Sequence, residues 1–156
     1  MNFDEAFEIL IGHEGGYVHN PADPGGETRY GISKRSYPEI DIKGLTLNQA
    51  KFIYRRDYWE KAGCPDLPTG LAFDVFDGAV NSGVNRSIKW LQQAAGVTDD
   101  GVLGPRTMQA VKALHPATIQ ARYNGVRLEF MTDLATWKTF GKGWARRIAQ
   151  NLQKAP

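Results

Sequence analysis

The chain has 156 residues, of which 42% are hydrophobic and 23% charged, and its formal net charge is +2. This length suits one domain or two small lobes and is sufficient to bury a sizeable core. The single cysteine, Cys64, excludes an internal disulfide, and its position before Pro65 favours a packing thiol over a nucleophile. No segment has the length and apolarity of a membrane span.

The first expected helix occupies the N-terminal segment. Its apolar residues recur at three- and four-residue spacing: Phe3, Ala6, Phe7, Leu10 and Ile11. Asn2 is a suitable N-cap, and Gly15-Gly16 ends the pattern because glycine readily adopts the left-handed conformation that closes a helix. Glu14 is therefore expected in the last turn, where unpaired carbonyls disfavour a charged carboxylate. A carboxyl that keeps its proton suits a general acid, although an exposed glutamate at a helix end is the ordinary alternative.

The segment from Tyr17 to Ile32 contains two prolines and three glycines, which exclude a regular helix and favour tight turns. Short extended pieces are expected around residues 17–18 and 28–30. Asp23 precedes a proline, which biases its backbone toward extended geometry. Taken singly, Asp23 reads as an Asx-turn residue and Thr28 as a strand hydroxyl. Two carboxylates flanking a sugar are nevertheless the minimum requirement for cutting a glycosidic bond, so Glu14, Asp23 and Thr28 together indicate a glycosidase.

These residues resemble a known family. Glu14-Gly-Gly-Tyr, Asp23-Pro-Gly-Gly-Glu-Thr28 and Tyr30-Gly-Ile32 closely resemble the signature of glycoside hydrolase family 108, muramidases found as phage endolysins and in bacterial secretion loci. The resemblance continues less specifically through Asn81-Ser82-Gly83 and so extends over most of the chain. It implies that Glu14 is the catalytic acid. The order of Glu14, Asp23 and Thr28 also resembles the glutamate–aspartate–threonine triad of phage-type lysozymes, although the second gap differs in length.

The middle of the chain is expected to be helical. Thr46-Leu-Asn-Gln49 is a capping box that opens a helix to about Tyr58. The apolar stripe of this helix comprises Leu47, Ala50, Ile53 and Tyr54. A second helix, over residues 71–80, is apolar around much of its circumference and is expected to be buried centrally. In a lysozyme-like fold such a helix borders the cleft, which makes Asn81 a candidate sugar-binding residue; capping of the helix end is the alternative.

The C-terminal part is expected to contain a helix from an N-cap at Asn85 to Ala95, a long helix over about residues 116–136, and a short one over about residues 144–152. Trp90-Leu-Gln-Gln followed by Asp100-Gly-Val-Leu-Gly-Pro-Arg-Thr107 resembles elements of small helical peptidoglycan-binding modules. The acidic run before Gly101 lacks the spacing and terminal glutamate of a calcium loop, so a structural turn is favoured.

Charge is distributed unevenly along the chain. Residues 1–33 carry six acidic side chains and one basic one, whereas residues 122–156 carry seven basic and two acidic side chains. The C-terminal cluster comprises Lys138, Lys142, Arg146, Arg147 and Lys154. It could orient the protein on an anionic envelope, or it could be an ordinary solvated face. Arg146 and Arg147 are expected to face solvent.

Aromatic side chains are plausible platforms for sugar rings, and Tyr30 and Tyr58 are selected as substrate-binding candidates together with Asn81. His13 and His19 lie near the two candidate carboxylates but lack an established ligand spacing. We expect no metal, no cofactor and no nucleic-acid partner.

The sequence thus predicts a mainly α (α+β), lysozyme-like fold with a small β-hairpin lobe around residues 17–32 and a helical lobe. Residues 1–93 are expected to form the glycoside hydrolase region. Residues 94–156 are expected to form a helical peptidoglycan-binding-like region, packed with the first as one compact unit. We expect a monomer.

The expected reaction is hydrolysis of the β-1,4 bond between N-acetylmuramic acid and N-acetylglucosamine in peptidoglycan, with Glu14 as general acid and a water positioned by Asp23 and Thr28. A lytic transglycosylase using Glu14 alone and a non-catalytic wall-binding module are the alternatives. The N-terminus lacks the basic start and apolar run of a signal peptide. We therefore expect synthesis in the cytoplasm and action on the wall in the periplasm after release by another factor.

Overall fold

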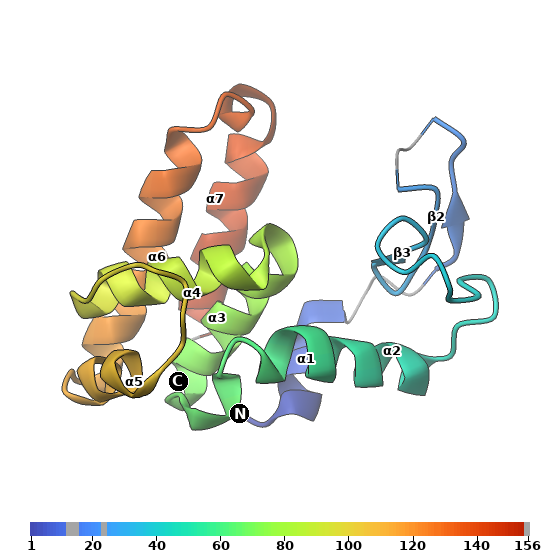
Figure 1. Ribbon diagram of the computed structural model, residues 1–156. Helices are drawn as coiled ribbons and strands as arrows, with labels where there is room; N and C mark the ends of the chain where they lie inside the picture. The colour runs from blue at the N-terminus through green and yellow to red at the C-terminus, as the bar shows by residue number, and fades with distance from the viewer. Residues whose placement is uncertain (12–15, 23–24, 155–156) are drawn as a thin grey trace. The chain divides into compact units, whose positions relative to one another are not determined.

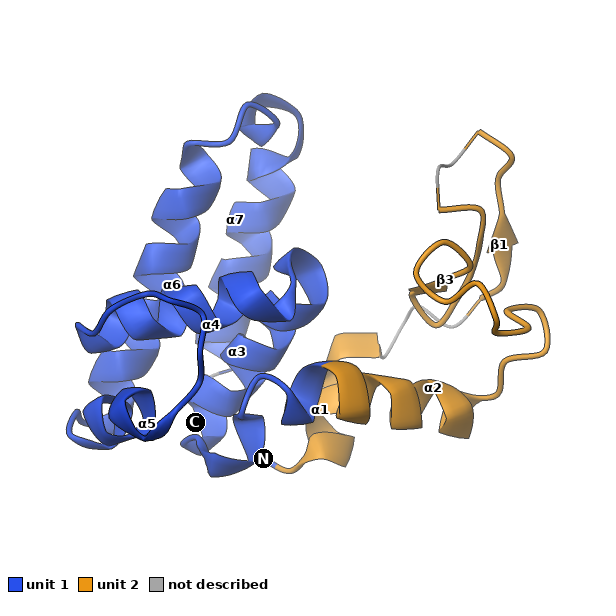
Figure 2. Cartoon of the chain, in the orientation of Figure 1, with its two compact units in different colours: residues 1, 58–156 blue, residues 2–57 orange. Residues whose placement is uncertain are grey.

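The computed structural model describes residues 1–11, 16–22 and 25–154, and it divides into two units (Figure 2). One unit comprises residues 2–57, and the other comprises Met1 with residues 58–156. The described residues are mostly helical, with one small antiparallel sheet, so the predicted lysozyme-like, mainly α fold is confirmed. None of the helices among these residues has the length and apolarity needed to cross a membrane.

Helix α1 (Phe3–Ile11) begins as the sequence predicts. The Asn2 Oδ1 atom accepts a hydrogen bond from the Glu5 N–H at 2.9 Å, and the Glu5 carboxylate accepts one from the Asn2 N–H at 3.0 Å. These reciprocal bonds satisfy amide groups that a helix N-terminus otherwise leaves without partners. The apolar face is buried, and the Phe7 ring packs edge-on against the Tyr54 ring, 5.5 Å between centroids.

The sheet has the order β1-β2-β3, with strands β1 (Val18–His19), β2 (Glu27–Arg29) and β3 (Ile32–Ser33). Arg29 pairs with Ile32, so only Tyr30 and Gly31 form the turn between β2 and β3. Both have positive φ values, 51° and 75°, which is the geometry of a type I′ hairpin turn. The extended piece predicted for residues 28–30 therefore ends one residue early, and β3 was not predicted.

Helix α2 (Leu47–Tyr54) opens at the predicted capping box of Thr46 and Gln49 and continues as a π-helical segment, η1 (Arg55–Glu60). Three members of its predicted apolar stripe are buried, but Leu47 is 46% exposed. Because helical side chains tilt toward the N-terminus, the first residue points past the end of the packed surface.

The larger unit is built around α3 (Thr69–Ser82), in which every residue from Gly70 to Ala79 is buried. A short 3-10 segment, η2 (Cys64–Asp66), leads into it. The other helices of this unit are α4 (Val84–Ala95), α5 (Pro105–Lys112), α6 (Pro116–Thr132) and α7 (Trp137–Gln153). Helices α6 and α7 run side by side, and α3 packs against α4 and α6 (Figure 1).

Two helix starts differ from the prediction. The N-cap of α4 is Gly83, and Asn85 lies in the first turn without capping it. Helix α7 begins at Trp137 rather than near residue 144. The extra turns contain Gly141 and Gly143, although glycine lowers helix propensity. A Cβ atom at Gly141 would overlap the Trp137 indole, whereas at Gly143 it would meet nothing within 4 Å.

The motif from Trp90 to Thr107 forms a structural turn, as favoured from the sequence. The Gln92 amide, which is 1% exposed, donates to Asp100 Oδ1 at 2.9 Å and to Thr107 Oγ1 at 3.1 Å. Its Oε1 atom accepts from the Gly101 N–H at 2.9 Å. One buried side chain therefore holds the α4–α5 connection against both helices.

Asp77 lies at the centre of the larger unit and is 1% exposed. Its Oδ2 atom accepts hydrogen bonds from Arg127 Nη1 at 2.7 Å and Asn151 Nδ2 at 3.0 Å. Its Oδ1 atom accepts from Arg147 Nε at 2.8 Å. Burial alone would raise the pKa of Asp77, but the charges and hydrogen bonds of Arg127 and Arg147 outweigh burial and lower it. One carboxylate thus joins α3, α6 and α7.

Asp74, one turn earlier on α3, has a different environment. Its Oδ2 atom accepts from Gln120 Nε2 at 2.9 Å and Asn124 Nδ2 at 2.8 Å, both on α6. Its Oδ1 atom is buried and has no hydrogen-bond partner among the described residues. Burial raises the pKa of Asp74 above its ordinary value, with the nearby charge of Asp77 adding to the effect.

We predict opposite effects for two matched substitutions on α3. Asp77→Asn should lower the free energy of unfolding by about 3–5 kcal/mol at pH 7, because it leaves the buried Arg127 without a counter-charge. Asp74→Asn should leave it unchanged or raise it, because the amide oxygen can accept both present bonds and the neutral group removes a buried charge. Urea unfolding of the two variants and the wild type measures both effects.

The two aspartates should also contribute differently to the change of unfolding free energy with pH. The lowered pKa of Asp77 means that its contribution is complete above its unfolded pKa, about 4, and is lost as pH falls through the folded value. The raised pKa of Asp74 means that any gain from Asp74→Asn exists at neutral pH and vanishes once pH falls below about 4. Equal destabilisation by both variants at pH 7 would contradict this account.

A second prediction concerns the two glycines of α7. Gly143→Ala should stabilise the protein by about 0.5–1 kcal/mol because alanine favours the helix and the site is open. Gly141→Ala should destabilise it by about 1–3 kcal/mol because the added methyl displaces the Trp137 indole. Thermal unfolding compares them, and a rise in Tm for both would show that the indole moves without cost.

Candidate functional site

The six site residues predicted from the sequence fall in different parts of the chain. Glu14 and Asp23 lie outside the described residues. Thr28 and Tyr30 belong to the smaller unit, and Tyr58 and Asn81 belong to the larger one.

Thr28 occupies the middle of β2, paired with Val18 on one side and Ser33 on the other. Adjacent residues of a strand point to opposite faces, so Thr28 projects away from the face of Glu27 and Arg29. Those two side chains hold the sheet: Glu27 accepts from the Tyr17 hydroxyl at 2.6 Å, and Arg29 donates to the Lys43 carbonyl at 2.7 Å. The Thr28 hydroxyl is therefore presented from a strand bonded on both edges.

Tyr30 lies at the turn rather than in the strand. Its carbonyl accepts a hydrogen bond from the Tyr54 hydroxyl at 2.7 Å, and its half-buried ring lies 5.4 Å from the Arg29 guanidinium. A Cβ atom at Gly31 would collide with the same Tyr54 hydroxyl, so the turn requires glycine there. These contacts fix the backbone of the turn at the end of the hairpin.

Tyr58 and Asn81 lie on two helical elements of the larger unit. Tyr58 is half-buried in η1, beside Trp59, whose ring packs edge-on against Phe76 at 5.4 Å. The Asn81 amide donates to the Asp77 carbonyl at 2.8 Å and to its carboxylate at 3.2 Å. Asn81 therefore bonds back along α3 rather than capping its end.

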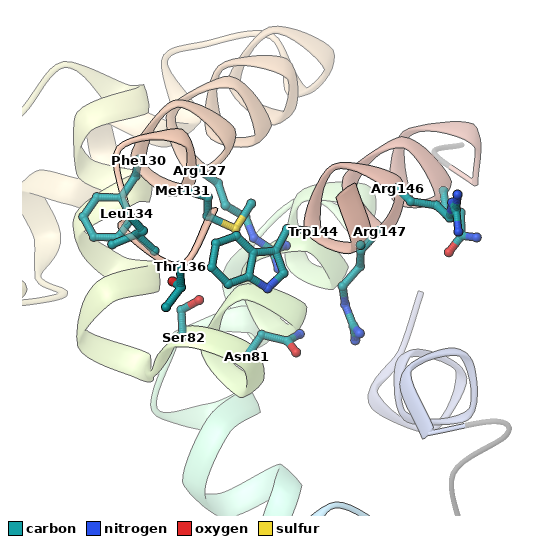
Figure 3. A pocket seen from close by; sticks show the side chains of 12 residues that line it. Asn81, Ser82, Arg127, Phe130, Met131, Leu134, Thr136, Trp144, Arg146 and Arg147 are labelled. Carbon is teal, nitrogen blue, oxygen red and sulfur yellow. The ribbon is translucent and has the colours of Figure 1, made fainter. Parts of the chain in front are cut away.

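A pocket of about 580 Å³ lies beside Asn81 and was not predicted from the sequence. It is formed by the end of α3, the second half of α6 and α7, together with the α6–α7 connection. Its lining residues are Asn81, Ser82, Arg127, Phe130, Met131, Leu134, Thr136, Gly143, Trp144, Arg146, Arg147 and Gln150. Figure 3 shows the Trp144 indole extending from α7 toward Asn81 and Ser82, with Met131 and Arg127 beside it.

Arg147, which was predicted to face solvent, does so only in part. Its side chain is 40% exposed, but two of its nitrogens, Nε and Nη2, contact Asp77 Oδ1 at 2.8 and 2.7 Å. The signal that could have found this pair is the presence of aspartates in a largely apolar helix, because a buried carboxylate requires a counter-charge or hydrogen-bond donors.

Two families of known proteins match successive parts of the chain. The family Glycosyl hydrolase 108 matches residues 7–83, and a family described as a predicted peptidoglycan domain matches residues 86–149. No curated protein matches the chain significantly. Twelve chains of solved structures match it. Among them, the structure of Brucella abortus SagA has a TM-score of 0.85 and 37% sequence identity, over 96% of this chain and 90% of that chain.

The first family match contains the hairpin lobe and the whole of α3, and the second contains most of the pocket. The similarity to SagA extends over both. The chain therefore belongs to glycosyl hydrolase family 108, and it is a glycoside hydrolase whose C-terminal half matches a peptidoglycan domain.

Proposed function

We propose that the protein is a muramidase that hydrolyses the β-1,4 bond between N-acetylmuramic acid and N-acetylglucosamine in peptidoglycan. The observation that carries the proposal is the order Glu14, Asp23, Thr28 within the residues matched by the hydrolase family. The position of Thr28 in the middle of a paired strand supports it, because a fixed hydroxyl can orient a water molecule.

In the proposed reaction Glu14 donates its proton to the oxygen that leaves with N-acetylglucosamine. A water molecule adds to the anomeric carbon of N-acetylmuramic acid and gives its proton to Asp23, while Thr28 holds that water by a hydrogen bond. Each product then carries one new hydroxyl group. A general acid on one side of the bond and a base on the other is the arrangement of inverting glycosidases, in which roughly 6.5–9.5 Å separates the two carboxyl groups.

Tyr30, Tyr58 and Asn81 are proposed to contact the substrate. The two tyrosines offer ring faces to the sugars, and the amide oxygen of Asn81 can accept a hydrogen bond because only its nitrogen binds Asp77. The predicted division of the chain at residues 93 and 94, with the two regions packed as one unit, stays a prediction.

Two alternatives differ in their products. A lytic transglycosylase would need Glu14 but no water-positioning pair, and it would leave 1,6-anhydro ends on the glycan. A wall-binding module would leave the glycan intact. Mass spectrometry of digested peptidoglycan separates all three possibilities, because hydrolysis alone yields reducing ends.

An endolysin role, in which another factor releases the protein from the cytoplasm to the wall, remains our hypothesis, as does a monomeric state. Contact between the basic C-terminus and an anionic envelope is also proposed. It would depend on Lys138, Lys142, Arg146 and Lys154, which are exposed, and less on Arg147, which is only partly exposed and shares Asp77 with Arg127. Such contact should weaken as salt rises, since charges act over roughly 8 Å at physiological ionic strength.

Glu14→Gln should reduce turnover on purified peptidoglycan by at least ~100-fold, since the nearly isosteric amide lacks only the transferable proton. Binding to insoluble peptidoglycan and the thermal unfolding midpoint should stay at wild-type values. Release of reducing ends measures turnover. Activity within a few-fold of the wild type in the folded variant would remove Glu14 from the mechanism.

Thr28→Val should lower turnover more than stability, because valine keeps the β-branched shape that suits a strand but removes the hydroxyl.

The anomer that the wild-type protein produces immediately after cleavage, observed by NMR, should be α if the water attacks directly. A fully active Thr28→Val variant would leave Asp23 to position the water alone, and a β product would point to a covalent intermediate.

A further inference from the structure

We propose that the pocket between α3, α6 and α7 binds a free carboxylate of the peptidoglycan stem peptide. This inference rests on the proposed function, because it takes peptidoglycan as the substrate. It adds a second recognition site, which binds the peptide rather than the glycan. The pocket lies wholly within the larger unit, and its volume of about 580 Å³ falls in the range of small-ligand sites.

The charge of the pocket points to an anionic ligand. Three arginines and no acidic residue line it. The carboxylate behind them, Asp77, is shared by Arg127 and Arg147, which leaves one of these two positive charges without a counter-charge. Asp74 bonds instead to the amides of Gln120 and Asn124 and lines no part of the pocket. Arg127 is 2% exposed and Arg147 40% exposed, so water screens this excess charge only in part.

Arg147 is the residue best placed to meet the ligand. Its contacts with Asp77 use Nε and Nη2, so the orientation of the guanidinium is fixed while the hydrogens on Nη1 have no partner among the described residues. Its 40% exposed side chain reaches the pocket surface, whereas Arg146 points away from Trp144 (Figure 3). A guanidinium held by one carboxylate loses little entropy on binding another.

The remaining lining favours a peptide over a sugar. Trp144, Met131 and Leu134 provide apolar surface next to the arginines, which suits the methyl and methylene groups of a short peptide. The Trp144 ring is stacked against Phe140, 5.9 Å between centroids, and is therefore held in place. The sugars of peptidoglycan carry no free carboxylate once the lactyl group is joined to the peptide, so the stem is the part with matching charge.

The test uses the full chain and the tripeptide L-Ala–γ-D-Glu–meso-diaminopimelate, which has free carboxylates and no glycosidic bond. The same peptide with its carboxylates converted to amides is the comparison. In ¹H–¹⁵N spectra the free acid should shift the indole resonance of Trp144, assigned with Trp144→Leu, and should leave that of Trp59, which is buried and lines no part of the pocket, unchanged. The amidated peptide should bind roughly tenfold more weakly, because it lacks the charge-assisted bond.

Arg147→Gln should weaken binding of the free acid by a similar factor. Arg106→Gln is the matched control: it removes the same group from an exposed position on α5, outside the pocket, and should leave affinity unchanged. If Arg147→Gln lowers the unfolding midpoint below the working temperature, the comparison of the two peptides on the wild type decides. Equal affinity for both peptides, or equal losses in the two arginine variants, would overturn the proposal.

Two further results separate this proposal from the others. Cleavage of peptidoglycan without any tripeptide-induced shift at Trp144 would refute the pocket and leave the muramidase standing. Tripeptide binding without cleavage of peptidoglycan would support the pocket and refute the muramidase. The last measurement is binding to phosphatidylglycerol vesicles. If the protein binds them through Arg147 and does not bind the tripeptide, the pocket binds a lipid phosphate and the stem-peptide proposal is wrong.

Discussion

The sharing of one buried carboxylate by two arginines determines how the larger unit is assembled. Asp77 is the point at which α3, α6 and α7 meet, and its partners come from positions 50, 70 and 74 residues away in the chain. Taking these charges out of water is costly, so the arrangement is stable only while all partners are present. The same requirement fixes Arg147 and Asn81 at the pocket. The buried Asp77 therefore also determines which polar groups line the pocket.

Local signals in the sequence accounted for most helix positions. The capping residues Asn2 and Thr46 predicted their helices correctly, and so did the largely apolar segment of α3, because these signals come from residues close together in the chain. The cap expected at Asn85 was a local error, since Gly83 caps α4, but other errors came from interactions across the chain. The length of α7 depends on an indole packing over Gly141, and the orientation of Arg147 depends on an aspartate 70 residues earlier.

The same distinction applies to the candidate site. Glu14, Asp23 and Thr28 could be selected because hydrolysis of a glycosidic bond requires particular groups at short spacing. The hairpin that presents Thr28 depends on a type I′ turn, and its first turn residue, Tyr30, was predicted as the end of an extended piece. The pocket was missed altogether, since its walls come from three helices with no common sequence pattern.

The Gln92 turn has a consequence for how such chains are recognised. Gln92, Asp100, Gly101 and Thr107 resemble a wall-binding motif, yet their polar groups are bonded to one another. Residues bonded to one another in this way stabilise the α4–α5 connection, and they do not indicate which molecule the protein binds. A pattern drawn from them would group proteins of common architecture whatever ligands they take. Ligand preference could then diverge at the α6–α7 surface while the motif, and the fold it specifies, remained intact.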